Sequence, residues 1–499
     1  MKRYIINPRL LAAITAGTLT VLPLASCKAE SETSMTTEQS QAVTETTPVL
    51  TSEEAFTGKD LEVGYDESEA ETITLNGSSA VSSSSSVNIS GNVITIKGKG
   101  TYIISGKLDD GYIAVDAGDS DDVRLILKGA DITSSDYAAI YCLKADNVFI
   151  TLEEGTENSL VNSGEFDSKD DNSVDGAVFA KTDVTINGAG ILKVSSTAHG
   201  IVGKDDVNIT GGVITIASEK DGIQANDSVA IQNATIDITC GKDGIQADND
   251  DDPTQGYIYI SSGNVTIDAE DDGITATSTL QIDDGTISIR NSYEGLEGQN
   301  ITINGGNISI VSSDDAVNAV SGSSGDMMHS DGISSITVTG GSVYVRSEGD
   351  GIDSNGTFEM SGGTLTVMGP VRGGNGSLDV AGTSNITGGT VIMAGTSDMA
   401  TNFTNASQGA ILINTGSQSE GTEISVSDAS GNVIVQATAD CNYQTVLISS
   451  PDLVIGNEYT VSAGNFSETV DLSEYIYGSG SGFGGGGFPG GNPGRRGGF

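Results

Sequence analysis

Apolar and polar residues alternate along short runs through the middle of this chain. Val213-Ile214-Thr215-Ile216 is one such run, and the runs are rich in Val, Ile and Thr and bounded by Gly, Asn or Asp. This pattern predicts short strands joined by tight turns, with one side of each strand buried. No stretch of the sequence shows the helical period, so we expect an all-β protein.

A three-residue phrase, an acid followed by a small and then an aliphatic residue, recurs along the same region. Its first residues are separated by steps of 22, 29, 22, 21 and 35 residues, which indicates a unit of about 22 residues with two insertions. A second phrase, as in Ile209-Thr210-Gly211-Gly212, runs in step with it. Weaker copies of the acidic phrase begin at Asp175 and His199, and the clear copies are Asp221-Gly222-Ile223, Asp243-Gly244-Ile245, Asp272-Gly273-Ile274, Glu294-Gly295-Leu296, Asp315-Ala316-Val317 and Asp350-Gly351-Ile352.

A repeat of this length, holding two or three short strands, predicts one coil of a single-stranded parallel β-helix, in which coils stack roughly 4.8 Å apart. We expect this solenoid over residues 59–404. The leucine-rich repeat has a similar period, but it requires Leu at fixed positions where this chain has Ile, Val, Gly and Asp. Over residues 405–477 the phrase is absent while strand patterns persist. We expect a small β cap there, because a solenoid needs its open ends covered.

The N-terminus has the pattern of an export signal. Basic residues precede an apolar run, and Leu24-Ala25-Ser26-Cys27 resembles a bacterial lipobox. The resemblance implies a signal peptide over residues 1–27 and a lipid on Cys27, which anchors the protein to the bacterial cell membrane on the extracellular side. Residues 28–58 have the composition of a flexible Ser/Thr/Glu-rich stalk, and residues 478–499 that of a disordered Gly-rich tail.

The net charge of the chain limits the classes of partner that it can bind. With 22 Lys+Arg and 68 Asp+Glu the formal charge is −46, which disfavours binding to nucleic acid or to anionic lipid surfaces and favours cations. Sixty-seven glycines and no Trp suit a turn-dense solenoid with a thin core of Ile and Val. The spacing of Cys142, Cys240 and Cys441 fits neither a zinc site nor a redox pair, so we expect buried free thiols.

Strand alternation predicts which way the residues of the acidic phrase point. It buries the second and fourth residues after the acid, such as Ile223 and Ala225, and turns the third and fifth outward. Because an unpaired buried carboxylate is costly, we expect the acid itself on the rim of an outward face. Carboxylates stacked about 4.8 Å apart repel by roughly 3 kcal/mol per pair at an effective dielectric of about 20, so the row needs compensation.

Lys220 and Lys242, which precede two of the acids, and shifted pKa values can supply part of the compensation. Calcium is predicted to supply the rest, since Ca²⁺ takes six to eight oxygen ligands, and a merely solvated acidic cluster is the alternative. Acids are densest around the third coil, where a loop beginning at Asp248 is inserted. The loop starts like an EF-hand, but it has Pro253 where that motif needs Gly and Tyr259 where it needs Glu, so it is only a calcium-like acidic loop. The predicted metal ligands are Asp221, Asp243, Asp248, Asp250, Asp251, Asp252, Asp271 and Asp272.

Several features together resemble a known family of bacterial surface proteins. These features are the lipobox, the Lys-Asp-Gly-Ile-Gln-Ala repeats at 220–225 and 242–247, the Glu-Asp-Asp-Gly-Ile sequence at 270–274 and the Gly-rich C-terminus. The chain resembles, over roughly residues 60–475, the calcium-containing, carbohydrate-binding β-helix proteins that are related in shape to pectate lyases. The resemblance implies a right-handed parallel β-helix that binds plant cell-wall polysaccharides, acidic pectins included.

The resemblance to a polysaccharide-binding family suggests where a sugar would bind. Calcium would bridge the acidic protein to a polygalacturonate chain, with lysines before two of the acids as direct contacts. Sugar rings stack on aromatic faces, and without Trp only Tyr can serve, which weakens the case for flat crystalline cellulose. The predicted substrate-binding residues are Lys220, Lys242, Gln224, Gln246, Tyr257 and Tyr293.

Three functions stay open. The first is non-catalytic, calcium-dependent binding of a plant cell-wall polysaccharide, with polygalacturonate or cellulose as the candidates. The second is a polysaccharide lyase in which Ca²⁺ acidifies a uronate proton and Lys220, Lys242 or Arg290 removes it. The third is a surface adhesin or scaffold with a protein partner. Nothing marks one base as desolvated, and His199 and His329 form no metal pair or catalytic triad, so we expect binding without catalysis.

Overall fold

A computed structural model describes residues 50–249, 251–321 and 330–478. Cys27 and Asp250 lie outside these residues, as do the Gly-rich tail beyond residue 478 and most of the expected stalk. The described chain consists of strands and turns apart from the one-turn helix α1 (Ser52–Ala55), so the all-β prediction is confirmed. No described helix is long and apolar enough to cross a membrane.

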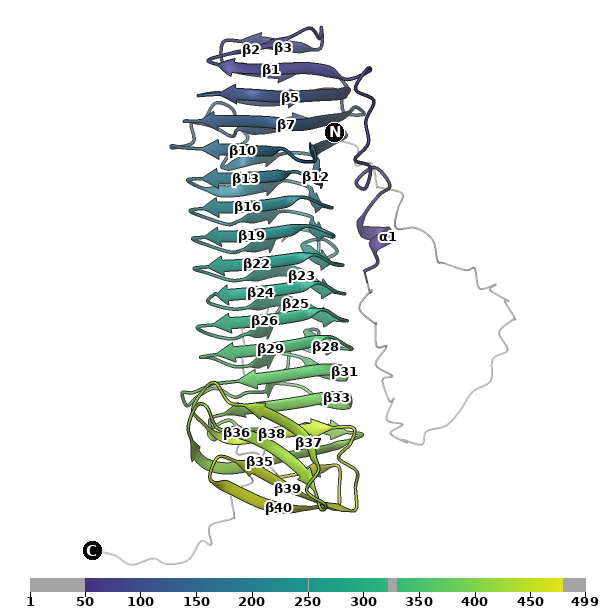
Figure 1. Cartoon of the computed structure of the whole chain (residues 1–499), viewed down its shortest axis with the longest axis vertical. Coiled ribbons are helices and arrows are strands. Elements are labelled where there is room, and N and C mark those ends of the chain that lie inside the picture. The colour runs from purple at the N-terminus through teal and green to yellow at the C-terminus, as the bar shows by residue number, and fades with distance from the viewer. Residues whose placement is uncertain (1–49, 250, 322–329, 479–499) are drawn as a thin grey trace, which may run out of the picture. The chain divides into compact units, whose positions relative to one another are not determined.

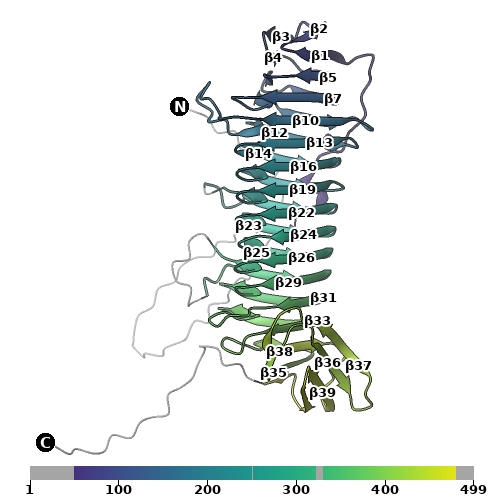
Figure 2. The same cartoon turned by 60° about the vertical axis from the view of Figure 1, so that its left-hand side comes forward.

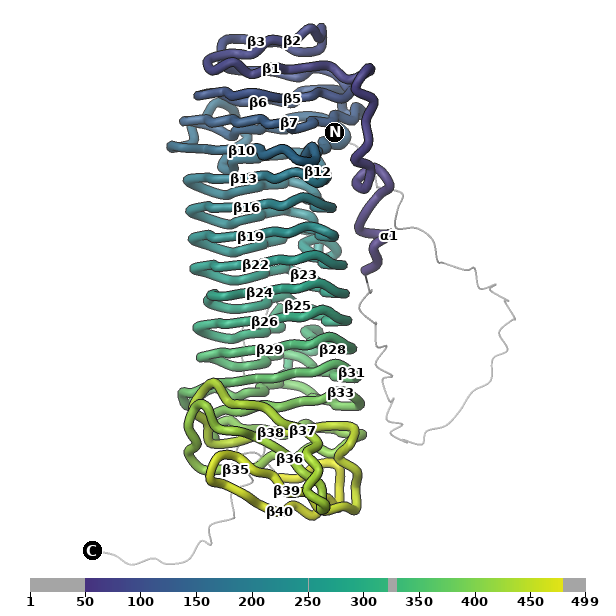
Figure 3. The backbone as a smooth tube through the Cα atoms, in the orientation of Figure 1, coloured from purple at the N-terminus to yellow at the C-terminus, as the bar shows by residue number. Residues whose placement is uncertain are grey.

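Most strands belong to three ladders of parallel strands, which we name A, B and C in the order in which a coil visits them (Figures 1 and 2). Each circuit of the chain, which can be followed along the backbone tube in Figure 3, adds one strand to each ladder. In ladder B, Ile201 pairs with Ile223 and Ile223 pairs with Ile245, so the register advances by the 22 residues of the repeat. The predicted stacking of repeat units as parallel strands is confirmed.

The ladders differ in strand length, and several strands run through a corner into the next ladder. Ladder A contains β10 (Glu157–Asn162), β13 (Ile191–Ser196), β16 (Val213–Ser218), β19 (Thr235–Cys240), β22 (Asn264–Ala269), β24 (Thr286–Asn291), β26 (Asn307–Ser312) and β29 (Ser342–Ser347). Ladder B contains β4 (Val93–Ile96), β6 (Tyr112–Asp116), β8 (Ile140–Lys144), β11 (Gly176–Ala180), β14 (His199–Gly203), β17 (Ile223–Ala225), β20 (Ile245–Ala247), β27 (Val317–Ala319), β30 (Ile352–Ser354) and β32 (Asp379–Val380). Ladder C contains β9 (Asn147–Leu152), β12 (Asp183–Gly188), β15 (Asp206–Ile209), β18 (Ser228–Ile231), β21 (Tyr257–Ile260), β28 (Ser335–Val338) and β34 (Asn405–Ala406). Strands β23 (Ile274–Ile282) and β25 (Leu296–Ile303) run from B into C, and β5 (Gly100–Leu108), β7 (Asp122–Ser134), β31 (Thr357–Met368) and β33 (Ser384–Gly395) run from C into A.

Antiparallel strands close both ends of the ladders. At the first coils β1 (Glu71–Gly77) pairs with β2 (Ala80–Ser82), and β3 (Val87–Ser90) pairs with β4. At the last coils β38 (Tyr443–Ser450) pairs with β33 and with β35 (Gly409–Gln418), and β35 pairs in parallel with the short β41 (Ile476–Tyr477). A separate antiparallel sheet contains β36 (Glu423–Asp428), β37 (Val433–Thr438), β39 (Asn457–Ala463) and β40 (Phe466–Leu472).

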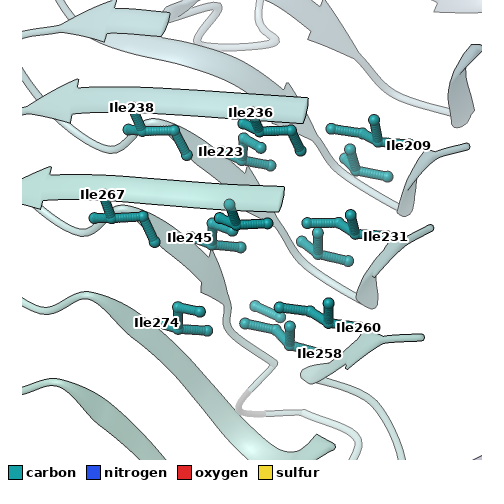
Figure 4. Close-up of a cluster of buried hydrophobic side chains, with 14 of the residues drawn as sticks. Ile209, Ile223, Ile231, Ile236, Ile238, Ile245, Ile258, Ile260, Ile267 and Ile274 are labelled. Atoms are coloured by element: carbon teal, nitrogen blue, oxygen red, sulfur yellow. The ribbon is translucent and has the colours of Figure 1, made fainter. Parts of the chain in front are cut away.

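Columns of isoleucine fill the space between the ladders (Figure 4). In ladder C, Ile231 pairs with Ile260 on the next coil, and in ladder B, Ile245 pairs with Ile274; all four side chains are fully buried. Burying one such side chain contributes about 1.5–3 kcal/mol. Cys142, Cys240 and Cys441 are buried free thiols, as predicted.

Residues 50–62, which we call the strap, run along the outside of ladder C. At one end Leu50 exchanges two hydrogen bonds of 2.8 Å with the side chain of Gln281, and at the other Thr185 Oγ1 donates to Asp60 Oδ1 at 2.6 Å. The expected flexible stalk over residues 28–58 is therefore wrong from residue 50 onward. The segment has the composition of a linker, but its residues form hydrogen bonds with coils that are distant in the sequence.

Phe56 of the strap is buried against Tyr259, with ring centroids 6.2 Å apart. Replacing a buried Phe by Ala costs roughly 3–5 kcal/mol. We expect Phe56→Ala to release the strap and to speed its cleavage in limited proteolysis by at least about tenfold, because cleavage follows the population of the open form. The melting temperature of the ladders should change little. Glu53→Ala, at an exposed position of α1, is the matched control, and equal cleavage rates for the two variants would contradict this role of Phe56.

Candidate functional site

The acids of the repeated phrase lie in one row at the turn from ladder A to ladder B, which we call the acid row. Backbone hydrogen bonds align successive coils here: Gly222 N–H donates to Asp243 O, and Gly244 N–H donates to Asp272 O, both at 2.9 Å. The repeat therefore places each acid directly beside the acid of the next coil. The row consists of Asp221, Asp243, Asp272, Glu294, Asp315 and Asp350.

Most carboxylates of the acid row accept a backbone N–H from the following coil. Asp243 N–H donates to Asp221 Oδ1 at 3.2 Å, and Asp272 N–H donates to Asp243 Oδ1 at 3.1 Å. Asp221 and Asp243 are only 5% and 8% exposed, so the expected position on the rim of an outward face is wrong for them. The expectation assumed that a buried carboxylate would lack a partner, and the N–H supplies one. The same bond recurs at Asp272, Asp315 and Asp350.

One N–H per carboxylate does not offset the charge of the row. Burial, together with the charges of neighbouring acids, raises the pKa of Asp243, Glu294 and Asp350 to about 7 each. The same causes raise the pKa of Asp315 to about 6. The repulsion predicted for stacked carboxylates is therefore present, and near neutral pH the row holds protons that ordinary carboxyl groups would have lost.

A second row of polar side chains lies on the outer face of ladder B, three residues after each acid, as the alternation predicts. Gln224 Nε2 donates to Gln246 Oε1 at 3.1 Å, and Gln246 Nε2 donates to Asp243 Oδ2 at 2.9 Å. Further along the row, burial and nearby acids raise the pKa of Glu297 and of Asp353 to about 8. The two rows thus form one acidic band.

Three groups of carboxylates in the described chain have oxygens within 4.8 Å of one another. The first contains Asp243, Asp271 and Asp272, all predicted as metal ligands. The second and third were not predicted as metal sites: they are Asp315, Asp350 and Asp353, and Asp183, Asp205 and Asp206. The second follows from the repeat, since Asp353 is the outward residue after Asp350. The third lies at the start of ladder C, where Asp183 and Asp206 begin equivalent strands.

The inserted acidic loop does not join these groups. Asp248, Asp251 and Asp252 are exposed, and Asp250 lies outside the described residues. Asp252 accepts the N–H and the hydroxyl of Thr254 at 2.9 and 2.7 Å, and these bonds lower its pKa. Its tip is therefore closed by local hydrogen bonds, as an acidic turn usually is, while its first residues bond to neighbouring coils: Asp248 accepts from Thr277 Oγ1 at 2.9 Å and Asn249 donates to Asp227 at 2.9 Å. Closeness in sequence to Asp243 made these residues look like part of one site.

The predicted sugar contacts are spread over several places. Lys242 Nζ lies 2.8 Å from Asp271, which raises the pKa of the lysine, and Lys220 Nζ lies 3.9 Å from Asp175. Both lysine side chains are about half exposed. Tyr293 is 47% exposed in the turn after β24. Tyr257 lies elsewhere, at the start of a ladder C strand and paired with Ser228. Tyr259 is buried under the strap and offers no ring face.

His199 ends the acid row on its N-terminal side. Its Nδ1 lies 2.9 Å from Asp221 Oδ2 and its Nε2 lies 3.5 Å from Asp175 Oδ2, so the imidazole sits between two carboxylates. The sequence predicts no metal pair or catalytic triad for His199, and it does not predict this position between two carboxylates. The available signal was that His199 occupies the position of the acid in a weaker copy of the repeat.

The donor set of the acidic band fits a hard divalent cation. Several carboxylate oxygens come from neighbouring coils, and burial makes their charges costly unless a proton or a cation offsets them. Asp243, Asp271 and Asp272 would hold such an ion. Without it, Lys242 offsets part of the charge through Asp271.

Comparisons with known proteins point to carbohydrates. Residues 90–332, just under half of the chain, match the family described as carbohydrate-binding domain-containing protein. A protein of that description from Acetivibrio thermocellus is 34% identical over 129 residues, which are 25% of this chain and 45% of that relative. The gadolinium derivative of a polysaccharide lyase-like protein from C. thermocellum is 30% identical, covers 48% of this chain and 93% of its own, and has a TM-score of 0.43. The family match includes the acid row from Asp221 to Asp315.

Proposed function

We propose that this protein binds an acidic plant cell-wall polysaccharide at the surface of a bacterial cell, without cleaving it and with the help of Ca²⁺. The observation that carries the proposal is the match of residues 90–332 to a carbohydrate-binding family, over a stretch that includes most of the acid row. In this proposal the three ladders form a right-handed, single-stranded parallel β-helix, and the lipobox anchors the chain to the membrane through Cys27.

Calcium enters the proposal through the acid row. A polyuronate and a chain of charge −46 repel each other, and a divalent cation held between carboxylates of both removes the repulsion. Asp243, Asp271 and Asp272 are the proposed ligands, and the group of Asp315, Asp350 and Asp353 is a second candidate with the same chemistry. The exposed aspartates of the inserted loop are not needed.

The lysines argue against a lyase. A general base near neutral pH needs a lowered pKa, which for a lysine comes from burial or a neighbouring cation. Lys242 has a raised pKa because Asp271 binds its ammonium group, and Lys220 is about half exposed beside Asp175. Lys242 is therefore suited to pairing with a carboxylate rather than to removing a proton from carbon, and the exposure of Lys220 leaves it without the burial that a lysine base needs.

Retention of the mature chain on immobilised polygalacturonate tests the proposal. We expect retention with Ca²⁺, loss of retention with a chelator and no rise in the ultraviolet absorbance that an unsaturated product would give. Rising absorbance would establish a lyase instead. Absence of retention under every condition would overturn the carbohydrate proposal and favour a scaffold with a protein partner.

Matched variants test which acids hold the metal. Asp272→Asn removes a charge from the acid row, whereas Asp252→Asn removes one from the exposed loop. We expect Asp272→Asn to weaken Ca²⁺ binding by at least about tenfold in titration calorimetry, a loss of about 1.4 kcal/mol, and to lower retention on polygalacturonate in parallel. Asp252→Asn should leave both unchanged. The reverse order of effects would move the metal site to the loop.

A further inference from the structure

The two halves of the acidic band differ in whether a base offsets their charge. Near the N-terminal half, Lys220 lies beside Asp175 and Lys242 beside Asp271. The C-terminal half ends in four carboxylates that we call the end group, and no Lys or Arg of the described chain forms an ion pair with them. The end group consists of Asp315, Asp350, Asp353 and Asp379. Its charge is therefore the uncompensated part of the band.

The arginines nearest to the end group in sequence are engaged elsewhere. Arg346 Nε lies 4.0 Å from Asp440, which belongs to the chain after the repeats. Arg372 lies 2.6 Å from Glu348, in the turn that precedes Asp350. Neither arginine offsets a carboxylate of the end group, so the cation that would do so has to come from another part of the chain or from solution.

The members of the end group act on one another. Oxygens of Asp315, Asp350 and Asp353 lie within 4.8 Å of one another, and Asp379 pairs with Asp353 on the next coil. Burial raises the pKa of Asp353 to about 8, and the charges of the other three contribute. Asn318 pairs with Asp353 in ladder B, and its Oδ1 is buried without a hydrogen-bond donor among the described residues. The end group and its neighbour thus offer acceptors and lack a positively charged donor.

The described chain ends beside the end group. Asn402 Nδ2 donates to the carbonyl oxygen of Gly478, the last described residue, at 3.2 Å. Thr401, the residue before Asn402, donates through Oγ1 to Leu378 O at 2.8 Å. Leu378 directly precedes Asp379 in the sequence. The C-terminal tail, residues 479–499, therefore begins close to the end group.

This tail contains the basic residues that the end of the sequence otherwise lacks. No Lys or Arg occurs between Arg372 and Arg495, and Arg495 is followed directly by Arg496. Arg495 is 17 residues beyond Gly478, and a Gly-rich segment of that length spans roughly 20–25 Å on average. Since neighbouring coils are about 4.8 Å apart, the arginines can reach every member of the end group. Such a linker holds them there at an effective concentration in the millimolar range.

We propose that Arg495 and Arg496 dock on the end group and that Ca²⁺ displaces them. The displacement rests on the proposed function, since it assumes that the acidic band binds Ca²⁺, whereas the docking does not. A guanidinium group carries only donors and binds carboxylates through parallel hydrogen bonds. It also supplies the donor that Asn318 Oδ1 lacks. The tail is thus a competitor within the chain, which keeps the end group paired until the divalent cation is abundant.

Tryptic cleavage of the tail in a chelator tests the docking without calcium or glycan. Cleavage after Arg495 or Arg496 is followed by the mass of the mature chain. The acid variant, Asp350→Asn with Asp353→Asn, should lose its tail at least about threefold faster than the parent, because a docked arginine is shielded from the protease; exposed ion pairs are individually weak, so the effect is modest. Asp251→Asn with Asp252→Asn, at exposed positions of the inserted loop, removes the same charge and should leave the rate unchanged.

Equal cleavage rates for the parent and the acid variant would overturn the docking and leave the proposed function standing. The same measurement at several protein concentrations identifies which copy supplies the tail. Protection that is independent of concentration supports docking within one chain. Protection that is lost on dilution would assign the bound tail to a second copy and overturn the intramolecular competitor.

Calorimetric titration with Ca²⁺ tests the displacement. The tail variant, Arg495→Gln with Arg496→Gln, changes no residue of the described fold. It should bind Ca²⁺ at least about threefold more tightly than the parent, because no arginine competes for the end group. Lys97→Gln with Lys107→Gln removes the same charge at exposed positions of the first coils and should bind as the parent does.

Equal Ca²⁺ affinities of the tail variant and the parent would overturn the displacement. If the parent binds no Ca²⁺, the displacement and the calcium step of the proposed function both fall, whereas cleavage in the chelator still decides the docking.

Discussion

Freed of divalent cations, the protein should become less stable as the pH rises from about 4 to about 8. The acidic band contains carboxyl groups whose pKa is raised in the folded chain, among them Asp243 and Glu294 at about 7 and Asp353 at about 8. In the unfolded chain these groups lose their protons near pH 4. Between these limits the folded state binds more protons than the unfolded state, so the free energy of unfolding falls with rising pH.

The expected size of this effect is large. One unit of pKa corresponds to 1.36 kcal/mol, so a group raised from about 4 to about 7 costs roughly 4 kcal/mol of stability once the pH exceeds its folded pKa. Because these carboxylates repel one another, part of each pKa shift is shared and the individual stability costs do not add. Together they still lower the free energy of unfolding by several kcal/mol. Ca²⁺ should restore the loss at about pH 8, because it binds the ionised carboxylates of the folded chain.

Thermal melts followed by circular dichroism, with a chelator and with Ca²⁺ across this pH range, measure the effect. Asp353→Asn should flatten the dependence in the chelator, since it removes one of the most strongly shifted groups. Asp252→Asn, in the exposed loop, is the control and should leave the curve unchanged. A melting temperature that rises with pH in the chelator, or that ignores Ca²⁺ at about pH 8, would contradict the electrostatic account of the acid row.

The architecture follows from the repeat. Strand alternation buries Ile223 and Ala225 and leaves Gln224 partly exposed, and the 22-residue step becomes the pairing of Ile201 with Ile223. These features are predictable because they are local: a period of two sets the burial, and a fixed repeat length sets the register. The antiparallel strands after residue 404 follow from the end of the repeat.

The candidate site was less predictable, since its partners come from other coils. The carboxylate of Asp243 meets a backbone N–H of the next coil, a contact that alternation within one strand does not reveal. Nearness in sequence predicts that the acidic loop joins the row, whereas its bonds are either within the loop or to Thr277 and Asp227, outside the acid row. Leu50 contacts Gln281, which is 231 residues away in the sequence, and no pattern in the sequence of the strap predicts this contact.

Gly244→Ala should strongly destabilise the ladders. In the structure a Cβ added at Gly244 meets the carbonyl oxygen of Gly273 at 2.5 Å and Ile267 Cγ2 at 2.6 Å. The backbone at Gly244 does not have a positive φ, so the need for glycine is steric: successive coils approach too closely at this turn to admit a methyl group. Overpacking a well-filled interior costs about 1–3 kcal/mol, and here one clash is with backbone that the coil stacking holds in place. We expect a loss of about 3 kcal/mol or more.

Gly64→Ala is the matched control, because no atom lies within 4 Å of the added methyl group and the backbone there is ordinary. Since alanine restricts the unfolded chain, this variant should change stability little or raise it by up to about 1 kcal/mol. Urea unfolding of the two variants separates the explanations. If both variants unfold at the same urea concentration, the glycine of the repeat is not required for the close approach of successive coils. One coil already has alanine at this position, because Ala316 follows Asp315 as Gly244 follows Asp243. The exclusion of a methyl group at Gly244 therefore depends on the local spacing of the coils rather than on the turn itself.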